Sequence, residues 1–168
     1  MKNIVRLANS SDIQEIIQLW LELMETHERI NAFFKMSEDA ESRFYRYLQS
    51  CIEPSDEKMN QVFVLVAQTK AQQNRKIIGY IMGNISTYPP VFEVQQYGDI
   101  SDICVSSDFR EQGIGRLLVN KAKKWYKDRG IQRIHIMAAS GNPIALIFWK
   151  KMGFEPIMQQ MYYTVDMG

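Results

Sequence analysis

The sequence predicts a mixed α/β fold, with a largely antiparallel sheet and flanking helices. Apolar residues recur at helical spacing in four segments, and runs of strand length lie before, between and after them. Turn residues connect these segments, and no repeat, linker or low-complexity tract divides the chain. We therefore expect one domain that spans residues 1–168, a length sufficient for a hydrophobic core.

The N-terminal part predicts one strand and two helices. Lys2–Ala8 alternates as a strand does, and Ser11 followed by Gln14 has the pattern of a capping box. The helix that this box begins runs to about Glu28. Its apolar stripe consists of Ile13, Ile16, Ile17, Trp20, Leu21 and Met24. A second helix begins at Ser37, and a proline follows the end of its apolar stripe.

The middle of the chain predicts two consecutive strands. Val62–Thr69 is a short, nearly continuous apolar run, typical of a strand that is buried on both faces. The polar stretch Lys70–Lys76 indicates a hairpin loop. Ile77–Thr87 then continues as a strand, in which Gly79 and Gly83 permit a bulge or a close approach of another chain segment.

A further strand and a helix follow a break at a pair of prolines. The strand runs from about Tyr97 to Val105, and the helix begins after the turn at Arg110–Gly115. Gly130 is a good helix stop, and basic residues in the last turns favour the negative end of the helix dipole. The apolar face of this helix consists of Ile114, Leu117, Leu118, Ala122 and Trp125.

The C-terminal part predicts three strands and a short helix. Ile131–Ala139 alternates as a strand, and Asn142 followed by proline begins a helix that reaches Met152. Two final strands occupy roughly Phe154–Met158 and Met161–Val165. The expected element order is therefore β-α-α-β-β-β-α-β-α-β-β.

The composition excludes several classes of function. Twenty basic and nineteen acidic side chains give a net charge of +1, so we do not expect nucleic acid as a partner. The run Val62–Ala67 is too short to span a membrane, and Arg6 interrupts any signal-peptide apolar region. Cys51 and Cys104 form no metal or disulfide spacing, so we expect no metal and a reducing, cytoplasmic setting.

The turn Arg110-Glu-Gln-Gly113-Ile-Gly115 indicates an anion site. A helix begins there, its first amides lack intrahelical partners, and the glycines allow an anion to come close. Arg110 adds a positive charge. A purely structural glycine pair is the alternative. A Walker P-loop would need Lys-Ser/Thr where Arg116-Leu117 stands, and a dinucleotide fingerprint would need a small residue at Leu118.

Two segments carry a resemblance to a known family. Ile103–Leu118 resembles the phosphate-binding motif of the GCN5-related N-acetyltransferase superfamily, which has Arg/Gln-x-x-Gly-x-Gly/Ala at a helix start after an apolar strand. Asn142–Phe154 is similar to that family's Asn-x-x-Ala-x-x-Phe-Tyr-x-Lys-x-Gly-Phe segment. The two motifs and the element order cover nearly the whole chain. The resemblance implies the acyl-CoA N-acyltransferase fold and acetyl-CoA as the co-substrate.

The resemblance also implies which residues contact CoA. The backbone after the middle of the Tyr97–Val105 strand would pair with the pantetheine arm, and the turn amides would hold the pyrophosphate. The implied CoA-binding residues are Ile103, Cys104, Val105, Arg110, Glu111, Gln112, Gly113, Ile114, Gly115, Arg116, Asn142 and Phe148. Two alternatives stay open, because Asn142 is also a plain helix N-cap and Phe148 is equally a core residue.

The implied reaction is direct attack of a primary amine on the acetyl thioester in a ternary complex. Only about one part in 2,500 of an alkylamine is neutral at pH 7, so a general base would help. Relatives place this carboxylate on the strand that holds the pantetheine. Asp99 and Asp102 are the available acids, and strict alternation puts them on opposite faces. We favour Asp99 as the base, with Asp102 as the alternative. Either residue could instead be a solvated acid at the end of a strand, without a catalytic role.

One position departs from the family pattern. Trp149 stands where relatives carry a tyrosine that protonates the departing thiolate, and an indole N–H does not release its proton at any useful pH. The proton donor is therefore unassigned, and a catalytically silent CoA-binding or regulatory module is the competing hypothesis. The acceptor is a small-molecule or peptide amine that the sequence does not identify. Relatives suggest a homodimer through the last strands.

Overall fold

The computed structural model describes residues 3–70 and 75–165, so most of the loop expected at Lys70–Lys76 lies outside the described residues. The chain divides into one compact unit of residues 1–137 and a second of residues 138–168. The first unit contains β1 (Ile4–Leu7), α1 (Ile13–Ile30), α2 (Ala40–Ile52), β2 (Val62–Gln68), β3 (Ile77–Thr87), β4 (Gln96–Val105), α3 (Ile114–Lys127) and β5 (Ile134–Ile136). The second contains α4 (Pro143–Lys151).

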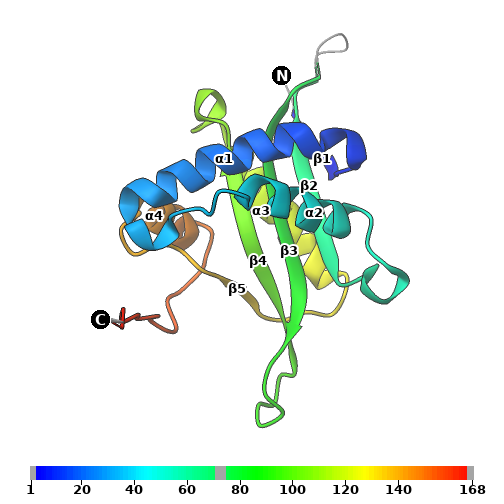
Figure 1. Cartoon of the computed structure of the whole chain (residues 1–168). Helices are drawn as coiled ribbons and strands as arrows, with labels where there is room; N and C mark the ends of the chain where they lie inside the picture. The colour runs from blue at the N-terminus through cyan, green and yellow to red at the C-terminus, as the bar shows by residue number, and fades with distance from the viewer. Residues whose placement is uncertain (1–2, 71–74, 166–168) are drawn as a thin grey trace. The chain divides into compact units, whose positions relative to one another are not determined.

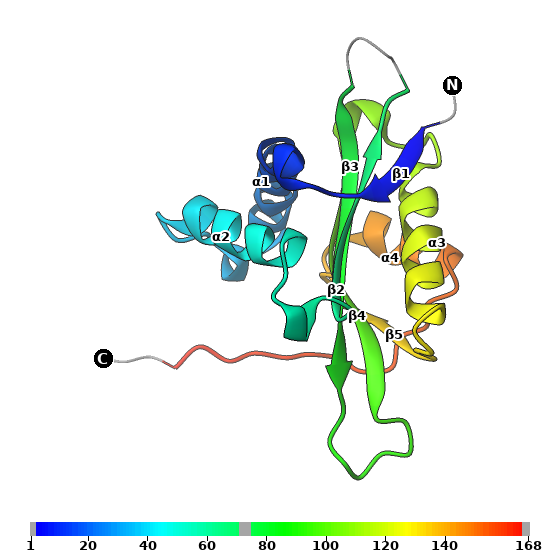
Figure 2. The ribbon, with the colours of Figure 1, turned by 90° about the vertical axis from the view of Figure 1, so that its right-hand side faces the viewer.

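The sheet has the strand order β1-β2-β3-β4-β5, as Figure 1 shows for the first unit. Neighbouring strands are antiparallel from β1 to β4, and β4 and β5 are parallel. Helices cover both faces: α1 and α2 lie on one and α3 lies on the other (Figure 2). The predicted mixed α/β class with a largely antiparallel sheet is therefore confirmed.

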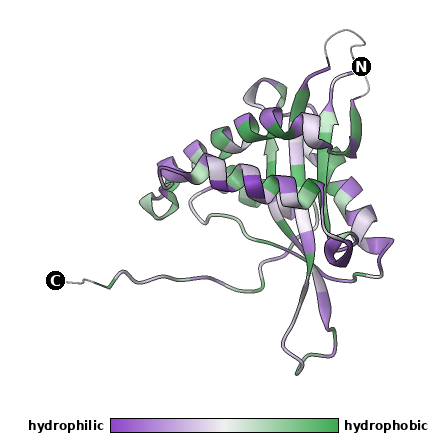
Figure 3. Cartoon of the chain, turned by 45° about the vertical axis from the view of Figure 1, so that its right-hand side comes forward, coloured by the Kyte–Doolittle hydropathy of each residue, from purple (hydrophilic) through white to green (hydrophobic). Residues whose placement is uncertain are grey.

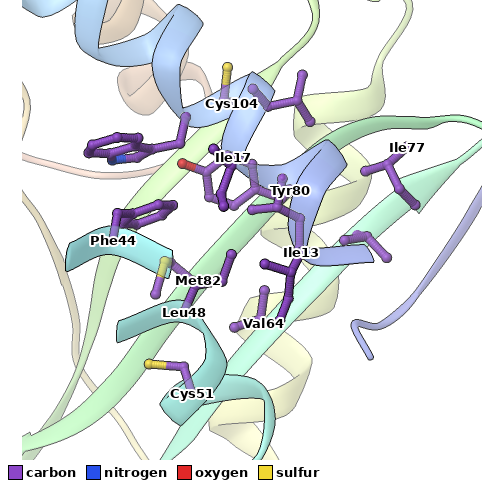
Figure 4. Close-up of a cluster of buried hydrophobic side chains, with 14 residues drawn as sticks. Ile13, Ile17, Phe44, Leu48, Cys51, Val64, Ile77, Tyr80, Met82 and Cys104 are labelled. Atoms are coloured by element: carbon purple, nitrogen blue, oxygen red, sulfur yellow. The ribbon is translucent and has the colours of Figure 1, made fainter. Parts of the chain in front are cut away.

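The core lies between the sheet and helices α1 and α2. The rings of Trp20 and Phe44 stack there with centroids 4.2 Å apart, and Tyr80, Met82 and Cys104 project from β3 and β4 into the same cluster (Figure 4). Coloured by hydropathy, the helices alternate between apolar and polar segments, whereas the inner strands are mostly white or green (Figure 3). Strand β2 is buried almost throughout, as its apolar run predicts.

Helix α3 packs on the opposite face through a stripe that differs from the expected one. The buried residues are Ile114, Leu118, Val119, Ala122 and Tyr126. Leu117 is 46% exposed and Trp125 is half-buried, contrary to expectation. The helix is apolar on both flanks of this stripe, so periodicity alone does not determine which flank meets the sheet.

The helix boundaries follow local hydrogen bonds that the sequence pattern only partly indicates. Asn9 and Asp12 form the capping box before α1, in place of the expected Ser11 and Gln14. A short 3₁₀ turn precedes the helix there, and Asp12 also binds Arg6 through two hydrogen bonds of 2.7 and 2.8 Å. This bidentate, charge-assisted pair favours Asp12 over a neutral capping residue.

The C-terminal strands are the largest departure from the expected fold. Strand β5 covers Ile134–Ile136, whereas Ile131–Ala139 was expected, because the Ile131 amide donates to Tyr126 O and closes the end of α3. The strands expected at Phe154–Met158 and Met161–Val165 are not formed, since residues 154–165 have neither helix nor strand. Alternation specifies the two faces of a strand but supplies no partner for its backbone groups.

Within the described ranges, no helix is long and apolar enough to cross a membrane.

Candidate functional site

A β-bulge in β4 organises the site. Met82 of β3 is opposite Asp102, but the next residue, Gly83, is opposite Ile100, so Ser101 is an extra residue in β4. Gly83 was expected to permit a bulge or a close approach, and both occur here. A Cβ atom at Gly83 would lie 2.5 Å from the Asp99 carbonyl oxygen and 2.5 Å from the Tyr126 hydroxyl.

The bulge places Asp99 and Asp102 on the same face of the sheet. Asp102 is opposite Met82, which belongs to the core under α1 and α2. Asp99 is opposite Asn84, which shares the face of Met82 because it is two residues along β3. The expectation that the two acids point to opposite faces is therefore wrong, because the extra residue shifts the alternation of β4 by one.

Both carboxyl groups are partly buried. Burial raises the pKa of Asp102 to about 6. Burial also raises the pKa of Asp99, and His135 partly opposes that rise. Among the residues that the structure describes, neither acid forms a salt bridge. Each is therefore a candidate to accept a proton or to bind a cation.

A fully buried hydroxyl lies next to Asp102. Tyr80 is opposite Cys104 on β4, so Asp102 is its diagonal neighbour on the same face. The Tyr80 hydroxyl has no hydrogen-bond partner in the described structure, and Figure 4 shows it pointing to the side of the cluster where Phe44 lies. Burial raises the pKa of Tyr80, and the neighbouring Asp102 raises it further. Burial likewise raises the pKa of Tyr47 on α2 to about 12.

Aromatic side chains cluster on the side of the sheet where Asp99, the other acid of β4, lies. His135 of β5 is the parallel partner of Asp99, and the Tyr97 and His135 ring centroids are 4.5 Å apart. Tyr88 packs on Tyr97 with centroids 4.3 Å apart, and its hydroxyl is hydrogen-bonded to His135 Nε2. Asp99 therefore lies beside the Tyr97 ring and the His135 imidazole, whereas Asp102 lies beside the phenol of Tyr80.

The second half of β4 leaves one edge open. Strand β5 pairs only with Gly98–Ile100, and in the described part of the chain it has no register with residues 101–105. The Ser106 amide donates to Ile78 O on β3, so by alternation Ile103 and Val105 direct their backbone groups to the other edge. Cys104 is different: it is the partner of Tyr80, and burial raises the pKa of its thiol to about 12.

The turn after β4 exposes backbone amides. Gly113 caps α3 in the left-handed region (φ 80°), and Glu111 also has a positive φ of 63°. The first helical amide with a backbone partner is that of Leu117, which donates to Gly113 O at 3.1 Å. Across the described chain no hydrogen bond from the amides of residues 111–116 is found. These amides and the helix dipole form a site for an anion.

Arg110 does not add a free positive charge to this turn, contrary to expectation. Its Nη2 donates to Glu22 Oε1 of α1 at 2.6 Å, and its Nε donates to Val105 O at 3.1 Å. The same Glu22 oxygen accepts the Ser107 amide at 3.1 Å. Glu22 therefore connects α1 to two residues of the β4–α3 loop, Ser107 and Arg110. The attraction for an anion comes mainly from backbone amides.

In the second unit, Asn142 is the N-cap of α4, where its side chain accepts the Ala145 amide at 3.0 Å. This is the N-cap role that was expected as one alternative. The ring centroids of Phe148 and Trp149 are 5.1 Å apart, and Phe154 packs on Trp149 at 5.0 Å. Trp149 is buried. No group of three or more potential metal ligands occurs among the described residues.

Sequence reasoning missed several of these residues. The sequence pattern gave no role to Glu22 or Tyr80. His135 alternates with Ile134 and Ile136, which predicts an ordinary sheet histidine, but the structure places it opposite Asp99. The only advance signal was the glycine at position 83, which permitted a bulge without indicating the residue of β4 that it would displace.

Known proteins resemble this chain in sequence and in fold. The model of the Acetyltransferase (GNAT) family matches residues 15–154. An uncharacterised N-acetyltransferase of Methanocaldococcus jannaschii is 33% identical over 82 residues, which are 49% of this chain and 36% of that protein. The matched stretch thus spans about a third of that relative's length.

Two solved structures show the same fold over almost the whole chain. A mutant of a Bacillus halodurans protein has a TM-score of 0.78 at 24% identity, covering 96% of this chain and 99% of that chain. An aminoglycoside N-acetyltransferase in complex with CoA has a TM-score of 0.72 at 16% identity, covering 98% of this chain and 95% of that chain. At these identities the likeness establishes the fold alone.

Proposed function

Because the chain belongs to the Acetyltransferase (GNAT) family, we propose that it is an N-acetyltransferase that moves acetyl from acetyl-CoA to a primary amine. One observation carries this proposal most directly: the unpartnered amides of residues 111–116 lie at the start of α3, directly after the open edge of β4. A diphosphate and an extended amide-containing arm are the chemical groups that such a turn and such an edge would bind.

In the proposed complex, the pyrophosphate of acetyl-CoA accepts hydrogen bonds from the turn amides. The pantetheine arm pairs with the backbone of Ile103 and with the Val105 amide, because the Val105 carbonyl already accepts Arg110 Nε. Asn142 and Phe148 stay candidates for further contacts to CoA. Glu22 and Arg110 would hold the loop in shape rather than neutralise the phosphates, because their charges satisfy each other.

The proposed reaction joins amine and thioester in one ternary complex. A carboxylate on β4 removes a proton from the acceptor ammonium, and the neutral nitrogen attacks the acetyl carbonyl carbon. The carbonyl oxygen becomes an oxyanion, which the Val105 or Ile103 amide would stabilise. The oxyanion then re-forms the carbonyl, the C–S bond breaks and CoA leaves as a thiolate, which is tolerable because a thiol has a pKa of about 8.5. The nitrogen, positively charged after the attack, releases its second proton to the thiolate or to water and becomes the neutral amide. The position of Asp102 on the core face, diagonal to the fully buried Tyr80 hydroxyl, favours it as the base over Asp99.

The first experiment measures acetyl-CoA binding by calorimetry and CoA thiol release over a panel of amines. Release that depends on the acceptor would support the transferase. Tight binding without release would support the silent CoA-binding module, for which Trp149 is the motivating feature. Absence of binding near millimolar acetyl-CoA would contradict both proposals.

A pair of glycines provides a matched test of the CoA turn. Gly113 precedes α3 and Gly130 follows it, both have positive φ, and a Cβ atom at either would meet no other atom within 4 Å. Alanine at each position therefore introduces a similar backbone strain of about 1 kcal/mol. We expect Gly113→Ala to weaken acetyl-CoA binding about tenfold and Gly130→Ala to leave it unchanged. Equal effects would show that strain alone, rather than the turn, controls binding.

Three wider features belong to the same proposal. We propose that residues 1–168 act as one domain, that the protein is cytoplasmic, and that it forms a homodimer. Two buried, unpaired thiols, Cys51 and Cys104, are consistent with a reducing compartment. Exposed apolar side chains at Ile157, Met161 and Tyr163 are consistent with an interface in residues 154–165. Light scattering of the full chain and of Tyr163→Ser tests the dimer.

A further inference from the structure

The outer edge of the sheet has free backbone groups at β1. In the described structure β1 lies at the end of the strand order and pairs with β2 alone. The Ala8 amide donates to Val64 O of β2, so by alternation Val5 and Leu7 direct their amides away from β2. The Leu7 carbonyl already accepts Arg6 Nη1 at 2.9 Å. Val5 thus offers an N–H and a C=O to a further strand, and Leu7 offers an N–H.

This edge lacks most of the features that keep an edge strand from pairing with another chain. Outward charges, prolines and bulges are the common protection. Strand β1 has no proline, and its register with β2 is regular. Its one charged side chain, Arg6, is hydrogen-bonded to Asp12 and Gln68. Because β1 has only four residues, an added strand would form few hydrogen bonds, and side-chain contacts have to contribute as well.

An open groove beside β1 supplies such contacts. It lies between β1 and α3, which Figure 2 shows side by side at this edge, and its volume is about 330 Å³. Its lining residues are Asn3, Val5, Leu117, Asn120, Lys121 and Lys124. Leu117 is the 46% exposed residue that was expected in the core, so the groove has an apolar part. An edge strand beside a groove is an arrangement to which extended peptides add as a further strand.

The groove is basic, so an acidic occupant would complement it. Lys121 is exposed and forms no salt bridge with any residue that the structure describes. Lys124 is paired with Asp128 at 2.9 Å, but the side chains are 66% and 51% exposed, and such a pair contributes little. Positive charge is concentrated on this helix, although the net charge of the chain is only +1. Against the one acid Asp128, its basic residues up to the C-terminal turn are Arg116, Lys121, Lys123, Lys124, Lys127 and Arg129.

We propose that an extended, acidic segment of a partner protein adds to β1 as a further strand and lies in this groove. Its backbone pairs with Val5 and Leu7, its acidic side chains meet Lys121 and Lys124, and an apolar side chain covers Leu117. A second copy of this chain is disfavoured, because pairing two β1 edges would bring two lysine-lined grooves together. Nucleic acid is disfavoured as well, since it lacks the peptide backbone that pairs with a strand.

The inference is independent of the proposed acetyl transfer. Val5 and Leu117 place the groove on the α3 face of the sheet, whereas Asp99 and Asp102 share the face under α1 and α2. A partner that is docked at β1 therefore holds this protein without occupying the face of the two acids.

The test measures the binding of short labelled peptides to the full chain by fluorescence anisotropy. In the acidic peptide, threonine alternates with one valine and two glutamates, so that the valine and the acids share one face. Two control peptides have glutamine or lysine in place of glutamate. We expect the acidic peptide to bind about fivefold more tightly than the glutamine peptide, as two exposed ion pairs provide. The lysine peptide should bind least, and high salt should reduce the differences.

Backbone methylation distinguishes strand addition from attraction between charges alone. In an added strand, alternate residues direct their amides to β1 and the others direct them to solvent. Two N-methylated forms of the acidic peptide, one for each set of residues, therefore form a matched pair. We expect one form to lose binding and the other to keep it. Equal affinities of the two forms, or loss of binding by both, would overturn the inference.

A charge reversal locates the groove. Lys121→Glu should weaken the acidic peptide at least fivefold and strengthen the lysine peptide. Lys127→Glu makes the same change at an exposed position of α3 outside the groove and should leave both affinities nearly unchanged. Thermal unfolding checks that both variants fold. Absence of acidic-peptide binding at millimolar concentration, or binding of a single-stranded oligonucleotide in its place, would contradict the proposal. So would a dimer of the free chain that Lys121→Glu makes tighter.

Discussion

The two faces of the sheet differ in how completely their groups are satisfied. On the α3 face, the Tyr126 hydroxyl donates to Asp99 O at 2.8 Å, and Gly83 and Gly98 leave room for its ring. On the α1–α2 face, Asp99 and Asp102 form no salt bridge with any described residue, and the Tyr80 hydroxyl has no hydrogen-bond partner among them. A face where every group is satisfied serves packing, whereas unmet polar groups indicate where a ligand acts. Four predictions test this contrast.

The largest expected effect is on activity at the unsatisfied face. Asp102→Asn removes the proposed base, so we expect kcat/KM at pH 7 to fall about 100-fold. In the wild-type protein, the rate should rise with pH through about 6, where the Asp102 carboxyl loses its proton. A pH–rate profile on one good acceptor measures both. A fall in the Asp99→Asn variant of similar size, with no fall in Asp102→Asn, would return the base to Asp99.

The same substitution should change stability in the opposite direction. The folded pKa of Asp102 is about 6 and lies above the unfolded value, so the folded protein binds this proton more tightly. Its stabilising contribution is present below about pH 4 and is lost as pH rises through about 6. At pH 7 we therefore expect Asp102→Asn to be more stable than wild type by about 1–3 kcal/mol, with the gain absent at pH 4. Urea unfolding at both pH values is the measurement.

On the satisfied face, an added methyl group should be harmful. A Cβ atom at Gly98 would overlap the Tyr126 ring, with Cδ1 at 2.5 Å. We expect Gly98→Ala to reduce the free energy of unfolding by about 1–3 kcal/mol. Thr87→Ala, at the exposed end of β3, is the control and should be near neutral. An undiminished stability of Gly98→Ala would show that α3 is able to move away from the sheet.

The smallest expected effect concerns the Tyr80 hydroxyl, which is buried without a hydrogen-bond partner in the described structure. Tyr80→Phe removes a buried group that has no hydrogen-bond partner, so we expect a gain of about 1 kcal/mol in stability. A loss of stability would mean that the hydroxyl is satisfied in solution, for example by a buried water shared with Asp102. Thermal unfolding of the two proteins distinguishes the signs.

The sequence was sufficient for most elements because their signals are local. Strand β3 occupies Ile77–Thr87 as expected, and the turn before α3 was recognised from its glycines. The sequence did not indicate which residues far apart in the chain contact each other. Nothing near Glu22 indicates that its carboxylate meets the Arg110 loop, 88 residues away. The C-terminal strands failed for the same reason, since alternation does not specify a partner.

The sequence named the residues of the candidate site, but the predicted directions of two of its side chains were wrong. Both β4 acids and the turn amides were identified from the chain, but the faces of the acids were not. Strict alternation is a property of regular strands, and the register between β3 and β4 shows one extra residue. A bulge depends on how two strands align, so either strand alone leaves its position undetermined.

The bulge at Ser101 makes the direction of the two acids depend on the number of residues in β4 as well as on their identity. Deleting Ser101 would reverse the face to which the side chains on one side of the deletion point. Asp99 and Asp102 would then point to opposite faces, although neither had been substituted. Insertions or deletions of one residue in this strand would thus change which acids face α1 and α2, while the turn after β4 keeps its sequence.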